Sequence, residues 1–127
     1  IFNSSKKKMW LEELLHPLIK DQVLKSLECS LSEYVILESP LLLETDQYKL
    51  TDRILVIDVS KEVQILRVQK RDRISADAIE AIITSQMPRM QKLKLANDVV
   101  ENTGSIEKFK LKIECLHKNY LTLAEEL

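Results

Sequence analysis

The chain has 127 residues, 45% of them hydrophobic and 31% charged, which suits one domain with a hydrophobic core. Its formal net charge of −1 disfavours a nucleic-acid-binding surface or a polybasic membrane anchor, and no apolar run approaches the length of a membrane span. Cys29 and Cys115 lie far apart without CxxC spacing, so we expect reduced, partly buried thiols in a cytosolic protein.

The first predicted element is a long helix that Ser4 or Ser5 can cap. Its apolar residues recur at helical spacing from Met9 to Leu27. Pro17 lies inside this pattern, so we expect a kink or a break in the helix at that point.

Two short apolar runs follow at residues 34–37 and 54–57, and a third short strand is predicted at 98–101. The first two runs lack the alternation of a one-sided sheet and are typical of parallel strands covered on both faces. Helical segments separate the predicted strands. This order predicts a parallel α/β sheet.

Three serines mark the starts of the later helices. Ser60 and Ser75 precede amphipathic segments, and Ser105 follows an Asn-Thr-Gly turn and begins a long final helix. Gly104 in that turn is the only glycine of the chain. Ends of strands that run into such turns are where parallel α/β sheets bind ligands.

Five motifs occur in an order that resembles one known family. They are Trp-Leu-Glu-Glu-Leu-Leu-His-Pro-Leu-Ile at 10–19, Glu-Ser-Pro-Leu-Leu-Leu-Glu at 38–44, Arg-Ile-Leu-Val-Ile-Asp-Val at 53–59, Arg-Val-Gln-Lys-Arg-Asp at 67–72, and the stretch 85–105. Together they resemble dephospho-coenzyme A kinase, the last enzyme of coenzyme A synthesis, over residues 2–124. Each motif alone is weak, whereas five in the right order are a strong signal.

The resemblance implies an α/β fold, namely a three-layer, P-loop kinase-like parallel sheet with a helical lid and acceptor-binding helices. It assigns residues 1–33 to the helical coenzyme A-binding region, 34–59 to core strands and 60–95 to lid helices. Residues 96–127 become a core strand, the adenine-side turn and the C-terminal helix. The family's first strand lies centrally, between the runs at 34–37 and 54–57, and is missing from this chain.

The family also has a glycine-rich phosphate loop of the form G-x-x-x-x-G-K-[ST], which a single glycine cannot build. We therefore expect the chain to be the C-terminal part of a larger kinase, inactive alone, with the N-terminal half of the same protein as its partner. The family's catalytic base is expected in that half as well.

Arginines near the end of the helix after Ser60 are candidate phosphate ligands. Arg67 and Arg71 stand four residues apart on one helix face. Guanidinium groups match phosphate oxygens and offset the charge that develops in phosphoryl transfer. The resemblance makes this region the lid, with Arg71 as the catalytic cation and Arg67 on the ATP side, whereas the residues alone also fit a solvated helix end. The family commonly has glycine where Arg73 stands.

The remaining ATP-side candidates follow the second lid helix. Arg89 matches the family's Gln-x-x-Arg pattern as a second phosphate contact and Gln86 is the weaker candidate, although both are ordinary polar residues at a helix end. The resemblance places Asn102 and Gly104 at the adenine end of the ATP site, where an amide offers donors and an acceptor. The same turn forms without a ligand too, since Asn and Gly tolerate left-handed backbone.

On the dephospho-coenzyme A side, the resemblance implicates Pro40 and Leu41 as the wall near the acceptor sugar and Glu44 as the residue that fixes this loop. Hydrophobic packing alone also explains the leucines. His16 is either a contact to the nucleotide part of coenzyme A or a hydrogen-bonded structural histidine. Asp58 resembles a strand-end aspartate that holds magnesium through water, but we favour its capping the next helix. No metal-ligand set is predicted in the chain.

The expected function is ATP-dependent phosphorylation of the ribose 3′-hydroxyl of dephospho-coenzyme A, giving coenzyme A and ADP, with Mg²⁺, in the cytoplasm. Two alternatives stay open. One is another nucleotide or nucleoside kinase of the same fold, and the other is a non-catalytic interaction module whose final helix is a dimer seam. No nucleic-acid or membrane partner is expected.

Overall fold

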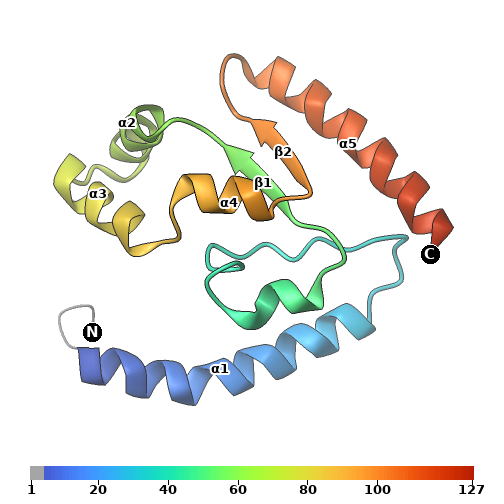
Figure 1. Ribbon diagram of the computed structural model, residues 1–127, viewed down its shortest axis with the longest axis horizontal. Coiled ribbons are helices and arrows are strands. Elements are labelled where there is room, and N and C mark those ends of the chain that lie inside the picture. The colour runs from blue at the N-terminus through green and yellow to red at the C-terminus, as the bar shows by residue number, and fades with distance from the viewer. Residues whose placement is uncertain (1–4) are drawn as a thin grey trace. The chain divides into compact units, whose positions relative to one another are not determined.

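The computed structural model describes residues 5–127, and the chain divides into two units, Ile1–Ile36 and Leu37–Leu127. The first unit holds α1 (Ser5–Glu28). The second holds η1 (Asp46–Leu50), β1 (Leu55–Asp58), α2 (Lys61–Asp72), α3 (Ala76–Ser85), α4 (Arg89–Leu95), β2 (Asp98–Glu101) and α5 (Ile106–Glu126) (Figure 1). Helices alternating with short strands are the α/β class that the sequence predicts.

The first helix, α1, is continuous over 24 residues, so the chain has no break at Pro17, and the kink offered as the alternative stays a prediction. A proline removes one N–H donor from a helix, but the hydrogen bonds of the turns before and after it still carry the helix through. Of the two predicted caps, Ser4 lies outside the described residues and Ser5 is the first residue of α1. No residue of α1 is buried, and its exposed apolar side chains include Met9 and Trp10.

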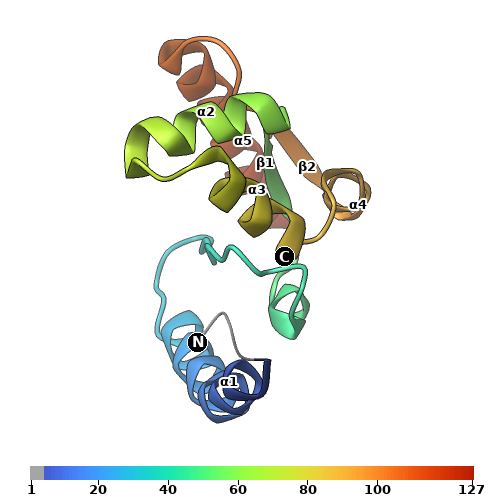
Figure 2. The same ribbon diagram turned by 90° about the vertical axis from the view of Figure 1, so that its left-hand side faces the viewer.

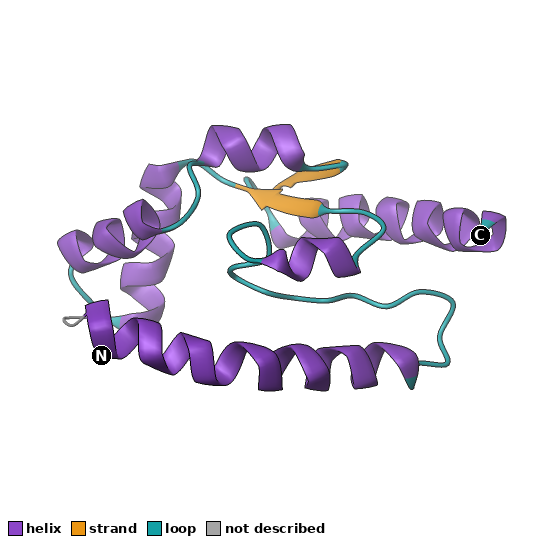
Figure 3. Ribbon diagram, turned by 60° about the horizontal axis from the view of Figure 1, so that its bottom comes forward, coloured by secondary structure: helices purple, strands orange, loops and turns teal. Residues whose placement is uncertain are grey.

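Strands β1 and β2 form a two-stranded parallel sheet in which Asp58 pairs with Glu101 (Figure 3). The parallel pairing predicted for these segments is confirmed. Because side chains alternate along a strand, Asp58 and Asp98 point to opposite faces of the sheet. Tyr120 of α5 donates a hydrogen bond to Asp98, and Arg89 of α4 donates to Asp58. Helices α5 and α4 therefore contact opposite faces of the sheet.

The strand predicted at residues 34–37 is wrong. These residues are not in a strand, and Val35 and Ile36 are 43% and 74% exposed. A strand persists where a neighbour satisfies its backbone N–H and C=O groups, and in the described part of the chain no strand pairs with this run. Apolar composition alone does not supply that neighbour.

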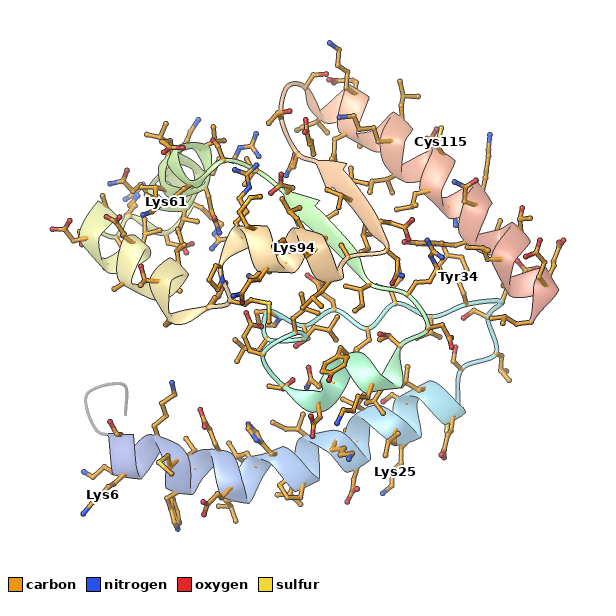
Figure 4. The ribbon with its side chains drawn as sticks, viewed as in Figure 1. Lys6, Lys25, Tyr34, Lys61, Lys94 and Cys115 are labelled. Carbon is orange, nitrogen blue, oxygen red and sulfur yellow. The ribbon has the colours of Figure 1, made fainter. Side chains whose placement is uncertain are left out.

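Side-chain caps begin the later helices, as predicted. The hydroxyl groups of Ser60, Ser75 and Ser105 each accept a hydrogen bond from the backbone N–H three residues later. Cys115 lies on α5 and Cys29 follows α1, and both thiols are exposed rather than partly buried as predicted, because neither occupies an apolar face that packs (Figure 4). Among residues 5–127, no helix has both the length and the apolar character that crossing a membrane requires.

Helices α2 and α3 pack against each other and form a unit that we call the helical arm (Figures 1 and 2). Ile79 of α3 is only 2% exposed, and Lys61 at the start of α2 forms an ion pair with Glu80 (Figure 4). The arm turns at Arg73, whose φ of 54° is left-handed. Glycine adopts this conformation without steric cost, so the turn keeps the shape that the glycine of the resembled family would favour.

Substitution of Arg73 tests the strain at this turn. We expect Arg73→Gly to raise the free energy of unfolding by about 0.5–1 kcal/mol. The steric cost of a Cβ in the left-handed conformation is larger than the extra conformational entropy that glycine loses when the chain folds. Arg73→Ala is the control, since it removes the same side chain and keeps the Cβ. Urea unfolding followed by circular dichroism measures the free energy of unfolding of both variants. An equal effect of the two substitutions would show that the backbone at Arg73 is not strained.

Candidate functional site

The candidate site lies where the two parallel strands end. Asp58 closes β1, and Asn102 follows β2 and donates a backbone hydrogen bond of 2.8 Å to the Asp58 carbonyl. Parallel pairing places both carboxyl ends at one edge of the sheet, which is where α/β sheets bind ligands. Arginines from α2 and α4 reach this edge, so cations and strand ends come together there.

The best-defined contact at this edge joins Arg89 to Asp58. The Arg89 Nε donates to Asp58 Oδ1 at 2.7 Å, and its Nη2 donates to Oδ2 at 2.8 Å. The Asp58 side chain is 8% exposed, whereas that of Arg89 is 52% exposed. This hydrogen-bonded guanidinium lowers the pKa of Asp58 although burial opposes the shift. The predicted capping role of Asp58 is wrong, because Ser60 caps α2 and both Asp58 oxygens accept from Arg89.

Arg89 keeps donors for a further ligand. A guanidinium has five N–H donors, and two of them are directed at Asp58. The remaining three belong to Nη1 and Nη2 of a half-exposed side chain whose plane is fixed by the bidentate pair. The hydrogen-bonded Asp58 carboxylate raises the pKa of Arg89, and the more distant carboxylates of Glu101 and Glu62 add to this, so an anion at this position competes with local negative charge. Arg89 is therefore a pre-oriented hydrogen-bond donor for an anion.

Arg67 of α2 binds the turn after β2. Its Nη1 donates a hydrogen bond of 2.7 Å to the Asn102 carbonyl, so the ATP-side candidates Arg67 and Asn102 are in direct contact. Gly104 in the same turn has a φ of 82°, and a Cβ placed there would meet only open space. The backbone angle, rather than crowding, therefore accounts for glycine at this position.

Arg71 lies one helical turn beyond Arg67, and it makes no such contact with the sheet edge. Its Nε and Nη2 donate to the carboxylate of the adjacent Asp72 at 2.7 and 2.8 Å, and its side chain is 73% exposed. The structure thus separates the two arginines of the arm. Arg67 is fixed to the core, and Arg71 lies at the solvent-exposed end of α2.

The acceptor-side candidates occupy the loop at residues 39–45. Pro40 and Leu41 are exposed, and the Thr45 hydroxyl donates to the Leu41 carbonyl at 2.8 Å. The carboxylate of Glu44 accepts a hydrogen bond of 2.8 Å from the backbone N–H of Met87. Sequence reasoning could not identify this partner, because Met87 contributes only its backbone.

His16 belongs to the first unit. It is exposed on α1 and lines a shallow surface hollow with Met9, Glu12 and Glu13. The hollow is formed by one helix face, so the acceptor-side role of His16 stays a prediction.

A second bidentate pair closes the opposite ends of the strands. Arg53 donates to both oxygens of Asp98 at 3.0 Å, and the Tyr120 hydroxyl donates to Asp98 at 2.8 Å. The guanidinium and the hydroxyl lower the pKa of Asp98. Asn97 accepts a hydrogen bond of 2.7 Å from the backbone N–H of Ile54. These contacts lie away from the candidate site and hold the strands in register.

A sequence model of the dephospho-CoA kinase family matches residues 1–108. The chain belongs to the dephospho-CoA kinase family. A dephospho-CoA kinase of Shewanella oneidensis is 40% identical over 124 residues, which cover 98% of this chain and 60% of that protein. That of Acinetobacter baylyi is 45% identical over 121 residues, covering 95% of this chain and 62% of that protein. The chain thus spans about three-fifths of the length of these curated relatives.

A solved structure has a similar fold. The crystal structure of TT1252 from Thermus thermophilus matches with a TM-score of 0.81 and 28% sequence identity, over 93% of this chain and 62% of that chain. Membership of the dephospho-CoA kinase family therefore rests on the sequence comparisons, and the structural comparison supports the α/β fold.

The pH dependence of stability tests the Asp58–Arg89 pair. Because the pKa of Asp58 is lower in the folded chain, its stabilising effect is complete above the unfolded pKa of about 4 and is lost as the pH falls through the folded pKa. We expect Asp58→Asn to lower the free energy of unfolding by about 1–3 kcal/mol at neutral pH, and the difference from wild type to shrink as the pH falls below about 4.

Urea unfolding between neutral pH and about pH 3 measures this difference. Asp52→Asn is the matched control, since Asp52 is exposed and lies outside both bidentate pairs. A difference that is the same at every pH would show that Asp58 does not stabilise the fold through its charge.

Proposed function

We propose that this chain forms part of an ATP-dependent dephospho-CoA kinase, which phosphorylates the ribose 3′-hydroxyl of dephospho-CoA and releases coenzyme A and ADP. Family membership across most of the chain supports this function. The single structural observation that carries it is Arg89, held by a buried carboxylate at the carboxyl ends of parallel strands with three donors left over.

Phosphoryl transfer makes a specific demand on the protein. The acceptor oxygen bonds to the γ-phosphorus while the bond from that phosphorus to the β–γ bridging oxygen breaks, and negative charge spreads over the phosphoryl oxygens. The protein mainly positions the reactants and offsets this charge. A guanidinium whose plane is already fixed does so without reorganising, because Asp58 has oriented Arg89 before the substrate arrives.

The two arginines of the arm take different parts in this proposal. Arg67 fixes the base of the arm to the turn that carries Asn102 and Gly104, which we assign to the adenine side. Arg71 at the exposed end exchanges its neighbour Asp72 for a phosphate oxygen when the arm closes as a lid. Both partners of the present Arg71 pair are solvated, so little stability is lost in the exchange.

The acceptor side is assigned to the 39–45 loop, with Pro40 and Leu41 at its surface and His16 as a further contact to the nucleotide part of dephospho-CoA. Both the three-layer P-loop sheet and catalysis require a phosphate-binding segment in addition to these residues. The greater length of the relatives supports such a segment as the partner of this chain. Among residues 5–127, β1 pairs with β2 alone, so its other edge is open to the further strand that the proposal requires.

Magnesium is expected to enter with the phosphates of ATP. Residues 5–127 contain no cluster of three His, Cys, Asp or Glu side chains that could hold a metal ion. Both oxygens of Asp58 are also engaged by Arg89. No catalytic step is therefore assigned to magnesium through this chain.

The substrate assignment is tested by coupled ADP release from the full-length gene product that contains this chain. We expect turnover with dephospho-CoA, far weaker turnover with nucleoside monophosphates, and none from the 127-residue chain alone, which has a single glycine and so no phosphate loop. A well-folded full-length product that phosphorylates nucleoside monophosphates in preference would make it a different nucleotide kinase.

The two bidentate pairs provide a matched test of Arg89. We expect Arg89→Lys to lower kcat by at least about 100-fold, because a lysine keeps the charge and loses the oriented fork. Arg53→Lys makes the same change in the pair with Asp98 at the opposite strand ends and is expected to leave kcat within about threefold. Equal losses of kcat in the two variants would assign a structural role to both pairs.

Arg71→Ala tests the lid. We expect it to lower kcat by more than it raises the KM for dephospho-CoA, because Arg71 acts on charge that develops in the transition state. Steady-state kinetics of the full-length product measure both constants. Unchanged values would show that Arg71 does not act on the transferred phosphoryl group as part of the lid.

A further inference from the structure

We propose that Glu44 is a positioning residue that holds the connector at residues 86–88, between the helical arm and α4, and thereby fixes the place of Arg89. The catalytic consequence rests on the proposed kinase function, whereas the contact itself does not. Glu44 then acts through the connector rather than by touching the acceptor.

Glu44 contacts the connector and the helix that follows it. Its Oε1 accepts a hydrogen bond of 2.8 Å from the Met87 N–H and lies 3.8 Å from the Lys92 Nζ. Lys92 in turn donates to Gln86 Oε1 at 3.3 Å. The side chains of Glu44 and Lys92 are 20% and 26% exposed. The partners of this partly exposed carboxylate belong to the connector and to α4.

The connector depends on such a contact because it is extended. Gln86 and Pro88 have ψ angles of 168° and 141°, and Pro88 begins α4 without a side-chain cap. The backbone N–H of Met87 lies between them, outside the hydrogen-bond patterns of both helices, and finds its acceptor in Glu44. Loss of the carboxylate leaves this donor to water and frees the connector.

Arg89 lies two residues after Met87, so a shift of the connector moves Arg89 directly. The Asp58 pair fixes the guanidinium at one end of this segment, and the Glu44 contact fixes its backbone at the other. Each contact joins residues far apart in sequence, with separations of 31 and 43 positions. Two such constraints determine both the position and the direction of the first turn of α4.

The placement of Glu44 also couples two sides of the candidate site. The 39–45 loop has its own hydrogen bonds, since the Thr45 hydroxyl donates to the Leu41 carbonyl and accepts from the Gln47 N–H. Glu44 therefore joins this loop, which is assigned to the acceptor side, to the connector that precedes Arg89. The acceptor-side loop and Arg89 become linked through one carboxylate.

The physical contact is tested first, in the full-length gene product. Glu44→Ala removes the acceptor of the Met87 N–H, and we expect the exchange rate of that amide with deuterium, followed by NMR, to rise by at least about tenfold. Glu44→Gln keeps an acceptor oxygen and is expected to retain most of the protection. Asp46→Ala is the control, since it removes an exposed carboxylate that pairs only locally with Lys49.

The positioning claim has two further readouts. We expect the NMR signal of the Arg89 Nε–H to shift in Glu44→Ala and to stay in place in Glu44→Gln and Asp46→Ala. With dephospho-CoA and ATP, we expect Glu44→Ala to lower kcat by roughly 10-fold or more while the acceptor KM changes less than about threefold, and Glu44→Gln to restore kcat to within about threefold of wild type.

The outcomes separate this proposal from the proposed function. Unchanged Met87 exchange, or an acceptor KM that rises as much as kcat falls, would overturn the positioning role and favour direct contact with the acceptor. Faster Met87 exchange with an unmoved Arg89 signal would overturn it as well. A folded wild type without turnover counts against the kinase function alone, because the exchange rate and the Arg89 signal still decide whether Glu44 holds the connector.

Discussion

Parallel pairing of β1 with β2 is the constraint from which the arrangement of this chain follows. The pairing brings both carboxyl ends to one edge and both amino ends to the other, and each edge receives one bidentate arginine–aspartate pair. At the amino ends Arg53, Asp98 and Tyr120 tie the strands to α5. At the carboxyl ends Arg89 is held by Asp58 and still presents donors outward. The same chemical pair is thus structural at one edge and available to a ligand at the other.

The helical arm is fixed near its base and unconstrained at its end. Arg67 binds the turn after β2, and Glu44 binds the connector that leads from the arm into α4. Arg71 pairs only with the exposed Asp72 beside it. The contacts of Arg67 and Glu44 join residues that are 35 and 43 positions apart, whereas Arg71 pairs with its direct neighbour, so motion of the arm is expected to move its end more than its base. The proposed lid role requires this division between a held base and a solvated cation.

Much of the local structure was predictable. The serine caps of α2, α3 and α5 and the parallel order of helices and strands follow from the sequence, because capping and periodicity involve neighbours along the chain. Two of the errors share one cause. Residues 34–37 have the composition of a strand but lack a paired neighbour, and Asp58 lies where a cap is plausible but meets Arg89, which is 31 residues away. Both depended on partners distant in the chain.

The sequence by itself determined the family, the arginines and the turn that carry the proposed chemistry, since these depend on residue types in a fixed order. Tertiary structure alone decided which of them are constrained. It gave Arg89 a buried carboxylate, joined Arg67 to the Asn102 carbonyl, and turned Glu44 toward the Met87 backbone. A sequence does not show which backbone N–H a side chain contacts. The angle at which a guanidinium meets a carboxylate is set by the packing of helices on strands. Contacts of that kind can be found only once the chain is folded.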